Sequence, residues 1–382
     1  MRVDLVDPPA YSPPYDHALA AALARLGADV RLLTSRFAYG AVPAPDGYAR
    51  DEFFYRHALG PAGSRARALS KRAEHLPDML RYRRAAARDA DIVHFQWLTV
   101  PRLDLRLLPD RPTVLTIHDP LERGRAPLGR DAFSGVDAIV VHSEYAREQV
   151  ITQHRLEPSR VHVIRHGAFL PTLGDFGRVR RQNSPSVPPE LPAELPAELR
   201  DSGEPVVLSY GLIRPYKGTE TLLRAWSGIS GAQLWIVGRP MIDVAPLTAA
   251  APPGARIVPR FVTPAEAATL FERADIVVLP YERSDRFGFS GVLATALGFG
   301  KAIVLSDVGG LAEIGSDRTQ PAARLVAPGD AAALHAALGE LIADGEARRR
   351  LATAAAHAAA TTYSWDAAAA ATLALYETIA RK

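Results

Sequence analysis

The sequence contains no cysteine, only four lysines and no long apolar run. Without cysteine, the 382-residue chain has no disulfide bond, thiolate zinc site, iron–sulfur cluster or cysteine nucleophile. No segment approaches the ~18 apolar residues that a membrane-spanning helix needs, and no signal-peptide core precedes Pro8 and Pro9. We therefore expect a cytoplasmic protein.

A large excess of basic charge is also lacking. The formal net charge is +3, which is too small for a chain of this length to indicate a nucleic-acid-binding protein. Hydrophobic residues make up 48% of the chain and favour an ordered globular protein over disorder. Because a chain of 382 residues usually exceeds one hydrophobic core, we expect two domains.

Short apolar segments alternate with helical segments along most of the chain, as is typical of parallel sheets covered on both faces. This pattern predicts two doubly wound, Rossmann-like α/β domains, at residues 1–170 and 205–363, joined by a proline-rich linker at 171–204. Because ligands of such sheets bind beyond the carboxyl ends of the strands, we expect them in the cleft between two facing domains. A final amphipathic helix within 364–382 can pack anywhere, including back onto the first domain. The predicted strands are 2–7, 29–34, 91–95, 113–117, 138–141, 161–164, 206–210, 233–237, 255–258, 276–279 and 302–305.

The turn after the first predicted strand has no glycine. A dinucleotide-binding domain needs Gly-x-Gly-x-x-Gly here, so the turn at 8–15 argues against NAD- or FAD-dependent chemistry. Tyr11, Ser12 and Tyr15 could instead face a sugar or lipid acceptor, because tyrosine offers a flat face and a hydroxyl group. A merely stiff loop is an equally good interpretation.

Two segments of the second domain are candidates for phosphate binding. In the first, Gly211 permits a tight turn, and Arg214 and Lys217 supply charge-assisted donors to an anion. In the second, Ser290 and Gly291 stand at the start of a predicted helix, where free amide groups can bind phosphate oxygens. A basic turn that contacts a neighbouring carboxylate is the alternative interpretation of the first segment.

The order of several short motifs resembles the retaining glycosyltransferases of the family-4 type, which have the GT-B fold of two facing Rossmann-like domains. The resemblance covers nearly the whole chain outside the linker, and it depends on the order of the motifs, since none of them is highly specific alone. The motifs are 91–94, 116–119, 141–144 and 164–167 in the first domain, and 211–218, 274–280, 288–304 and 307–313 in the second.

The resemblance implies roles for individual residues. His118 matches the histidine that contacts the donor sugar, and Gln96 and Trp97 are candidates for the acceptor side. Two glutamates of the family would stand at Phe287 and Thr295, which cannot act as carboxylates. The family also has an arginine at the position of Leu212, and Arg214 is its substitute. The implied donor-binding residues are Gly211, Asp285, Phe287, Gly288, Phe289, Ser290, Gly291, Val292 and Thr295, with His118, Arg214 and Lys217 as the catalytic group.

The activity implied by the resemblance is glycosyl transfer from a nucleotide sugar, a UDP- or GDP-sugar, with retention of the anomeric configuration. We expect no metal and no further cofactor, because the sequence lacks a convincing paired-carboxylate cluster such as Asp-x-Asp. The acceptor is a small molecule, a glycan or a lipid-linked molecule. A nucleotide-sugar epimerase of the same fold is an alternative, and the missing glutamates keep open a catalytically inactive sugar-nucleotide-binding protein.

The segment 64–88 is rich in basic residues. Such a face could rest on anionic lipid at the inner side of the membrane, at about 1 kcal/mol for each basic residue close to the surface. A solvated helical face is the alternative interpretation.

Overall fold

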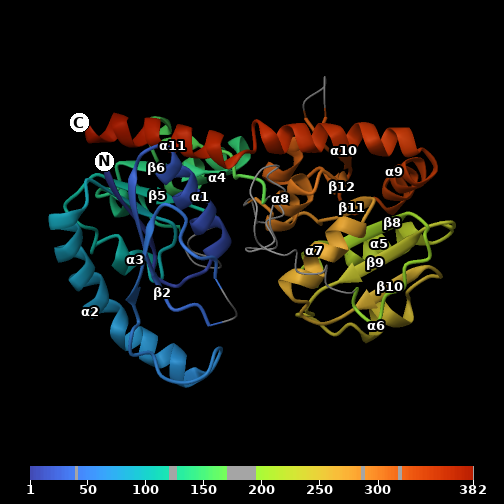
Figure 1. The fold of residues 1–382 in the computed structure, drawn as a ribbon, viewed down its shortest axis with the longest axis horizontal. Coiled ribbons are helices and arrows are strands. Elements are labelled where there is room, and N and C mark those ends of the chain that lie inside the picture. Colours follow the sequence, from blue (N-terminus) through green and yellow to red (C-terminus); the bar gives the residue numbers. More distant parts are fainter. Residues whose placement is uncertain (39–41, 120–126, 170–194, 285–288, 317–320, 382) are drawn as a thin grey trace, which may run out of the picture. The chain divides into compact units, whose positions relative to one another are not determined.

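The computed structural model describes residues 1–38, 42–119, 127–169, 195–284, 289–316 and 321–381. These residues form two compact units (Figure 1). The first unit comprises Met1–Gly167 together with Trp365–Lys382, and the second comprises Ala168–Asp285 together with Phe289–Ser364. Most of the predicted linker, residues 171–194, lies outside the described residues.

The first unit is built on a seven-stranded parallel sheet with the strand order β3-β2-β1-β4-β5-β6-β7. Helix α11 comes from the far end of the chain and packs against α1 in this unit. The strands are β1 (Arg2–Asp7), β2 (Asp29–Ser35), β3 (Ala49–Phe54), β4 (Ile92–Phe95), β5 (Thr113–Thr116), β6 (Ala138–Val141) and β7 (Val161–Val163). The helices are α1 (Pro13–Arg25), α2 (Arg65–Asp89), α3 (Pro101–Asp104), α4 (Glu144–His154) and α11 (Trp365–Ala380).

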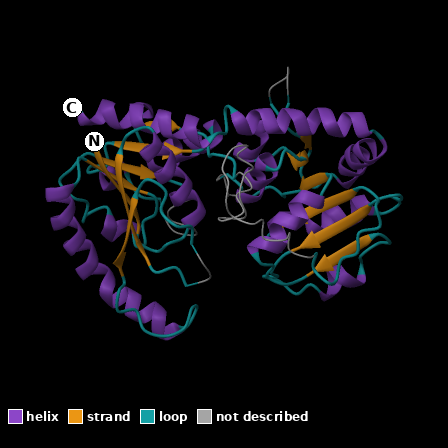
Figure 2. Ribbon diagram, in the orientation of Figure 1, coloured by secondary structure: helices purple, strands orange, loops and turns teal. Residues whose placement is uncertain are grey.

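The second unit has a six-stranded parallel sheet with the order β10-β9-β8-β11-β12-β13. Figure 2 shows the strands in orange and the helices in purple. Its strands are β8 (Val206–Tyr210), β9 (Gln233–Val237), β10 (Ala255–Val258), β11 (Ile276–Leu279), β12 (Ala302–Ser306) and β13 (Arg324–Val326). Its helices are α5 (Thr219–Trp226), α6 (Ala245–Ala249), α7 (Pro264–Arg273), α8 (Gly291–Gly298), α9 (Ala331–Ala343) and α10 (Gly345–Ala360).

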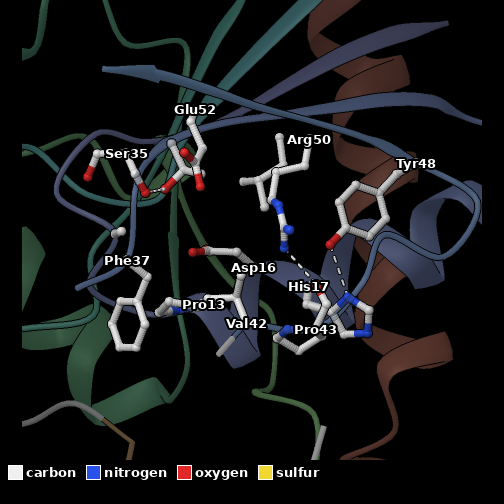
Figure 3. A pocket seen from close by; sticks show the side chains of 13 residues that line it. Pro13, Asp16, His17, Ser35, Phe37, Val42, Pro43, Tyr48, Arg50 and Glu52 are labelled. Carbon is white, nitrogen blue, oxygen red and sulfur yellow. Dashed lines mark hydrogen bonds between the residues drawn. The ribbon is translucent and has the colours of Figure 1, made fainter. Parts of the chain in front are cut away.

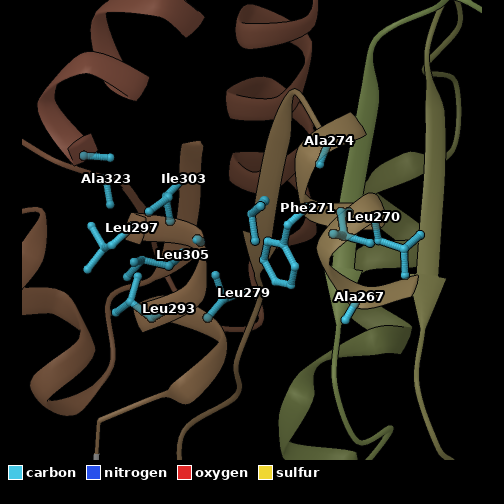
Figure 4. Close-up of a cluster of buried hydrophobic side chains, with 14 of the residues drawn as sticks. Ala267, Leu270, Phe271, Ala274, Leu279, Leu293, Leu297, Ile303, Leu305 and Ala323 are labelled. Atoms are coloured by element: carbon cyan, nitrogen blue, oxygen red, sulfur yellow. The ribbon is translucent and has the colours of Figure 1, made fainter. Parts of the chain in front are cut away.

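The strands of the second unit are apolar at consecutive positions because both faces of the sheet are covered. Leu279, Ile303 and Leu305 point to one face, where they pack with residues of α7 and α8 such as Phe271 and Leu297 (Figure 4). The alternate residues of the same strands form a separate cluster with α5 and α9 on the other face. This arrangement explains why the strands appear in the sequence as short unbroken apolar runs.

Two strands were not expected from the sequence. Strand β3 has the sequence Ala-Arg-Asp-Glu-Phe-Phe and pairs only with β2, at the edge of the first sheet. Strand β13 has three residues and lies at the edge of the second sheet. Edge strands need only partial burial, so neither segment carries a clear apolar pattern.

Several helices begin with residues whose side chains cap their free amide groups. Thr263 and Glu266 form a reciprocal capping box at α7, with Pro264 in the first turn. Ser64 caps α2 by accepting a hydrogen bond from the Arg67 amide. Of the helices in the described part of the chain, none is both long enough and apolar enough to cross a membrane.

Candidate functional site

Both sheets have the strand order of a doubly wound fold, in which the chain reverses direction beside the first strand. In the first unit this switch point lies between β1 and β4, and in the second between β8 and β11. Ligands of doubly wound sheets bind at the carboxyl ends of the strands at this point. The loops that follow these four strands therefore define the candidate site in each unit.

The loop after β8 is shaped by two glycines. Gly211 has φ +107° and Gly218 has φ +68°, values that favour glycine. A Cβ on Gly218 would lie 1.7 Å from the carbonyl oxygen of Pro280, which directly follows β11. The loop therefore packs closely against the neighbouring strand end and includes a short 3-10 turn, Pro215–Lys217.

Lys217 is held at the switch point of the second unit by a tyrosine. Its Nζ donates a hydrogen bond to the hydroxyl oxygen of Tyr281 and lies 3.9 Å from the centre of the tyrosine ring. The Tyr281 hydroxyl is in turn 3.1 Å from Ser290 Oγ, and burial raises the pKa of Tyr281 above its ordinary value of 10. Lys217, Tyr281 and Ser290 form a connected polar group, which we call the lysine group.

Helix α8 begins beside the lysine group. Ser290 is its N-cap residue but makes no side-chain cap, so the first amide groups of the helix are available to an anion. The helix start is close to the loop after β8, because a Cβ on Gly211 would lie 3.2 Å from a methyl group of Val292. The Thr295 hydroxyl donates to the Gly291 carbonyl at 2.9 Å, and Phe289 stacks on Tyr363.

Arg214, another predicted donor-binding residue, lies in the same loop as Lys217. The half-buried guanidinium of Arg214 makes no hydrogen bond or ion pair with any described residue. It lines a cavity of about 290 Å³ together with Gly218 and Thr221. Asp285, Phe287 and Gly288 lie outside the described residues.

In the first unit, four histidines stand at or just beyond the carboxyl ends of β4, β5, β6 and β7. These are His94, His118, His142 and His166. Burial lowers the pKa of all four, to about 3 for His94 and His166 and to about 4 for His142. The rings are therefore neutral at ordinary pH. Across the part of the chain that is described, no three His, Asp or Glu side chains are grouped so that they could hold a metal ion.

The predicted acceptor-side residues come together around His118. The Trp97 ring stacks on His118, with ring centres 4.8 Å apart and planes at 17°, and Trp97 Nε1 donates to Ser12 Oγ at 2.7 Å. Tyr11 meets the edge of Trp97. Tyr15 is buried, and its ring packs edge-on against His118, His166 and Trp365.

Gln96 and His118 carry polar atoms without partners. Gln96 is fully buried, and neither its amide oxygen nor its amide nitrogen makes a hydrogen bond to a described residue. The same holds for Nε2 of His118, which is itself shielded from solvent. Since buried polar groups are nearly always paired, these atoms are available to a water molecule or a bound ligand.

A pair of buried acids stands beside this group. Asp7 ends β1, next to Gln96, which directly follows β4, and its side chain interacts directly with that of Asp16 on α1. Burial raises the pKa of both carboxyl groups; the charge of Asp7 raises that of Asp16 further, whereas the hydrogen bond with Asp16 lowers that of Asp7. The pair therefore favours a state in which Asp16 keeps its proton.

A small cavity lies on one side of Asp16. It is lined by Asp16, Ser35, Tyr48, Arg50 and Glu52 among others, and His17 Nδ1 lies 3.0 Å from the Tyr48 hydroxyl (Figure 3). Its volume of about 20 Å³ has room for about one water molecule and not for a sugar ring. The acceptor-side residues, and not this cavity, therefore form the candidate site of the first unit.

Two family models match the chain, one in each unit. The model described as Glycosyltransferase Family 4 matches residues 15–168, and the model described as Glycosyl transferases group 1 matches residues 204–344. The chain belongs to the family-4 glycosyltransferases.

Curated relatives and solved structures agree with this assignment. This glycosyltransferase is 26% identical to the D-inositol 3-phosphate glycosyltransferase of Kineococcus radiotolerans, over 94% of the chain and 88% of that relative. It is similar to sucrose-phosphate synthase from Thermosynechococcus elongatus, with a TM-score of 0.70 and 17% identity over 99% of both chains. It is also similar to Anabaena HepE in complex with UDP, with a TM-score of 0.68 and 15% identity over 99% of this chain and 100% of the other. The glycosyltransferase therefore has the expected GT-B fold.

Three features of the site were missed by sequence analysis. Tyr281 directly follows the motif at 274–280, but nothing in the sequence indicated that its hydroxyl contacts Lys217. Asp7 and Asp16 were not considered, although Asp16 shares a helix face with Leu19 and Leu23, and an acid on an apolar face is an available signal.

Proposed function

We propose that this glycosyltransferase takes its sugar from a UDP- or GDP-activated donor. The observation that carries the proposal is the lysine group at the switch point of the second unit, beside the free amide groups of α8. A compact ammonium group and a helix N-terminus together are well suited to phosphate oxygens. The solved complexes of Anabaena HepE with UDP and with UDP-glucose support a donor of this class.

The same residues meet the charge that develops during transfer. As the bond between the sugar and the diphosphate breaks, negative charge grows on the leaving diphosphate, and Lys217, Arg214 and the α8 amides stabilise it. We propose that these groups act without a divalent metal and that the configuration at the anomeric carbon is retained, as in the family that the chain resembles.

The first unit is the proposed acceptor side, with His118 touching the donor sugar. The unpaired amide of Gln96 and the ring of Trp97 offer hydrogen bonds and a flat surface to a hydroxyl-bearing acceptor. Because curated relatives are named D-inositol 3-phosphate glycosyltransferases, inositol 3-phosphate is the first acceptor to assay.

Binding and turnover separate this proposal from its alternatives. Thermal-shift measurements with UDP, GDP, ADP and TDP should show a melting temperature that rises with the logarithm of the concentration of the correct nucleotide. Nucleoside diphosphate should then be released from the sugar donor only when an acceptor is present. Conversion of the donor without release would support an epimerase, and binding without turnover over a broad donor panel would support an inactive binding protein.

Replacing Lys217 by alanine tests the lysine group directly. We expect kcat to fall by about 10²–10³, because one preorganised donor to the leaving group is lost, and UDP or GDP to bind more weakly. Arg324→Ala is the control, since it removes an exposed cation of the same unit that pairs with Glu340. Near-normal turnover by the Lys217→Ala variant would show that the lysine group is not the phosphate site.

We also propose that α2 rests on an anionic membrane. Arg72, Arg83 and Arg84 are exposed on this helix, and Leu69 and Leu76 are 63% and 44% exposed beside them. Basic and apolar groups on one exposed surface are typical of helices that lie in the membrane interface.

Co-sedimentation with vesicles of phosphatidylcholine and phosphatidylglycerol at low salt tests this proposal. The protein should pellet with the vesicles, and the double variant Arg83→Glu/Arg84→Glu should remain in the supernatant. The double variant Arg130→Glu/Arg155→Glu changes the same charge elsewhere on the first unit and should still pellet. Absence of the unchanged protein from the pellet would end the membrane proposal.

A further inference from the structure

His142 connects the backbone to His118 through its two ring nitrogens. Its Nδ1 lies 2.9 Å from the carbonyl oxygen of Ile164, and its Nε2 lies 3.2 Å from Nδ1 of His118. His142 is buried, and its ring is packed by Tyr15 and His166. The side chain therefore has a fixed orientation between two specific partners.

The chemistry of the partners decides where each proton lies. A carbonyl oxygen only accepts, so Nδ1 of His142 must carry a proton. Burial lowers the pKa of His142 to about 4, and at ordinary pH the neutral ring has no second proton. Nε2 of His142 is therefore an acceptor, and the hydrogen bond to His118 requires a proton on Nδ1 of His118.

The protonation state of Nε2 of His118 follows from these hydrogen bonds. Burial also lowers the pKa of His118 well below its ordinary value, so its ring is neutral and Nε2 carries a lone pair. This is the atom that is shielded from solvent and has no partner among the described residues. In contrast, both ring nitrogens of the neighbouring His94 are paired, with the Tyr376 hydroxyl at 2.6 Å and Thr116 Oγ1 at 2.7 Å.

We propose that His142 is a positioning residue that holds His118 in the Nδ1–H tautomer, so that Nε2 of His118 accepts a hydrogen bond from a hydroxyl group of the donor sugar. The inference rests on the proposed function, in which His118 touches that sugar. It adds a requirement: the contacted group of the sugar must donate a hydrogen bond, so fluorine cannot replace the hydroxyl group.

Nitrogen-15 NMR of the histidine side chains tests the tautomer without any substrate. The spectra are recorded at pH 7.5, which is about one unit above the ordinary pKa of histidine. His118 should show a protonated Nδ1 and an unprotonated Nε2. Its signals are assigned by their loss in His118→Gln. In His142→Phe the partner of Nδ1 is lost, and the signals should move toward the Nε2–H form that free neutral histidine prefers. His142→Gln offers an amide oxygen to His118 and an amide N–H to Ile164, and it should restore the original pattern.

His94→Phe is the matched control. It also leaves two buried partners without a hydrogen bond, on a neighbouring strand, but it does not touch either nitrogen of His118. His118 should therefore keep the Nδ1–H form in this variant. An Nε2–H form of His118 in the unchanged protein would overturn the proposal even if His142→Phe failed to fold, and so would an unchanged tautomer in a folded His142→Phe variant.

Transfer from UDP-glucose provides the second readout. We expect His142→Phe to lower kcat/KM by roughly 10- to 100-fold, as loss of a supporting hydrogen bond behind a functional group does elsewhere, and His142→Gln to recover most of it. Analogues of UDP-glucose with one hydroxyl at a time replaced by fluorine should reveal one position at which the unchanged enzyme discriminates more strongly than His142→Phe. Equal discrimination at every position would contradict the role assigned to His142. A lack of transfer from every UDP- and GDP-sugar of a broad panel would contradict the proposed function and leave the NMR result to decide the tautomer.

Discussion

Asp16 shows how much of this site depends on single buried residues. It lies on the face of α1 that also carries Leu19 and Leu23, and it is buried against Asp7 at the end of β1. Two carboxyl groups buried against each other are unfavourable when both are charged, so the folded protein retains a proton that the unfolded chain releases. A buried pair of carboxyl groups that lowers stability and lies beside the unpaired amide of Gln96 is typical of a functional site.

Replacing Asp16 by asparagine should therefore stabilise the protein at neutral pH. The pKa of Asp16 is raised in the folded state, so its contribution to the free energy of unfolding is largest below the ordinary pKa of 3.8 and decreases as the pH rises from there. Each unit of raised pKa corresponds to about 1.4 kcal/mol, and we expect the variant to gain at least about 1 kcal/mol at pH 7.

Urea unfolding at several pH values measures this effect. The gain of Asp16→Asn over the unchanged protein should shrink toward pH 4, close to the ordinary pKa. Asp29→Asn, at an exposed position of the same unit, is the control and should show no such trend. The difference in free energy of unfolding between Asp16→Asn and the unchanged protein should be larger at pH 7 than at pH 4. A smaller difference at pH 7 would be incompatible with a proton retained by the buried pair.

At the scale of single elements, the loops after the strands were predicted better than the edges of the sheets. The turn after β8 was predicted from Gly211, because tight turns depend on residues that are adjacent in sequence, while anion binding by Arg214 and Lys217 stays a prediction. Strand β3 was missed because an edge strand with polar residues has no apolar pattern of its own. The partner of Lys217 was missed because Tyr281 is 64 residues away.

Gly218→Ala should disrupt the loop after β8 far more than an ordinary glycine substitution. The added Cβ would lie 1.7 Å from the Pro280 carbonyl oxygen at a φ of +68°, so the loop or the end of β11 must move. We expect a loss of stability of about 1–3 kcal/mol or more, together with weaker nucleotide binding, because Lys217 moves with the loop.

Thermal unfolding and nucleotide titration check this prediction. Gly203→Ala is the matched control, since Gly203 has a φ of +79° but nothing within 4 Å of an added Cβ. It should lose only about 1 kcal/mol and retain nucleotide binding. Equal effects of the two substitutions would mean that backbone strain, and not contact with Pro280, determines the cost.

At the scale of the whole molecule, each compact unit is not one continuous stretch of sequence. Helix α11 follows the whole second unit in sequence but packs against α1 of the first. Its Tyr376 is fully buried and bonded to His94, and its Trp365 leaves no room for a side chain at Gly167. The histidines at the strand ends of the first unit therefore depend on residues from the far end of the chain.

Removing residues 365–382 should destabilise the first unit and leave the second largely intact. The deletion exposes apolar surface of α1 and leaves His94 Nδ1 without its partner, which together cost several kcal/mol. Hydrogen exchange should show loss of protection in β1, β4 and α1 while β8 and β11 remain protected. Deletion of residues 381 and 382 alone is the control, and full protection of β4 after the longer deletion would disprove the dependence on α11.

By itself the sequence determined the α/β class and the turn that carries Lys217, because apolar runs, helix spacing and tight turns are encoded by residues close together in the chain. The order of its short motifs established the resemblance to the family-4 glycosyltransferases, which implied the GT-B fold. Only the tertiary structure decided that Asp7 meets Asp16, that Tyr281 holds Lys217, that His142 stands between Ile164 and His118, and that α11 belongs to the first unit. These contacts depend on strand register and on burial, which bring together side chains from distant parts of the chain and leave a few polar atoms unpaired for a ligand.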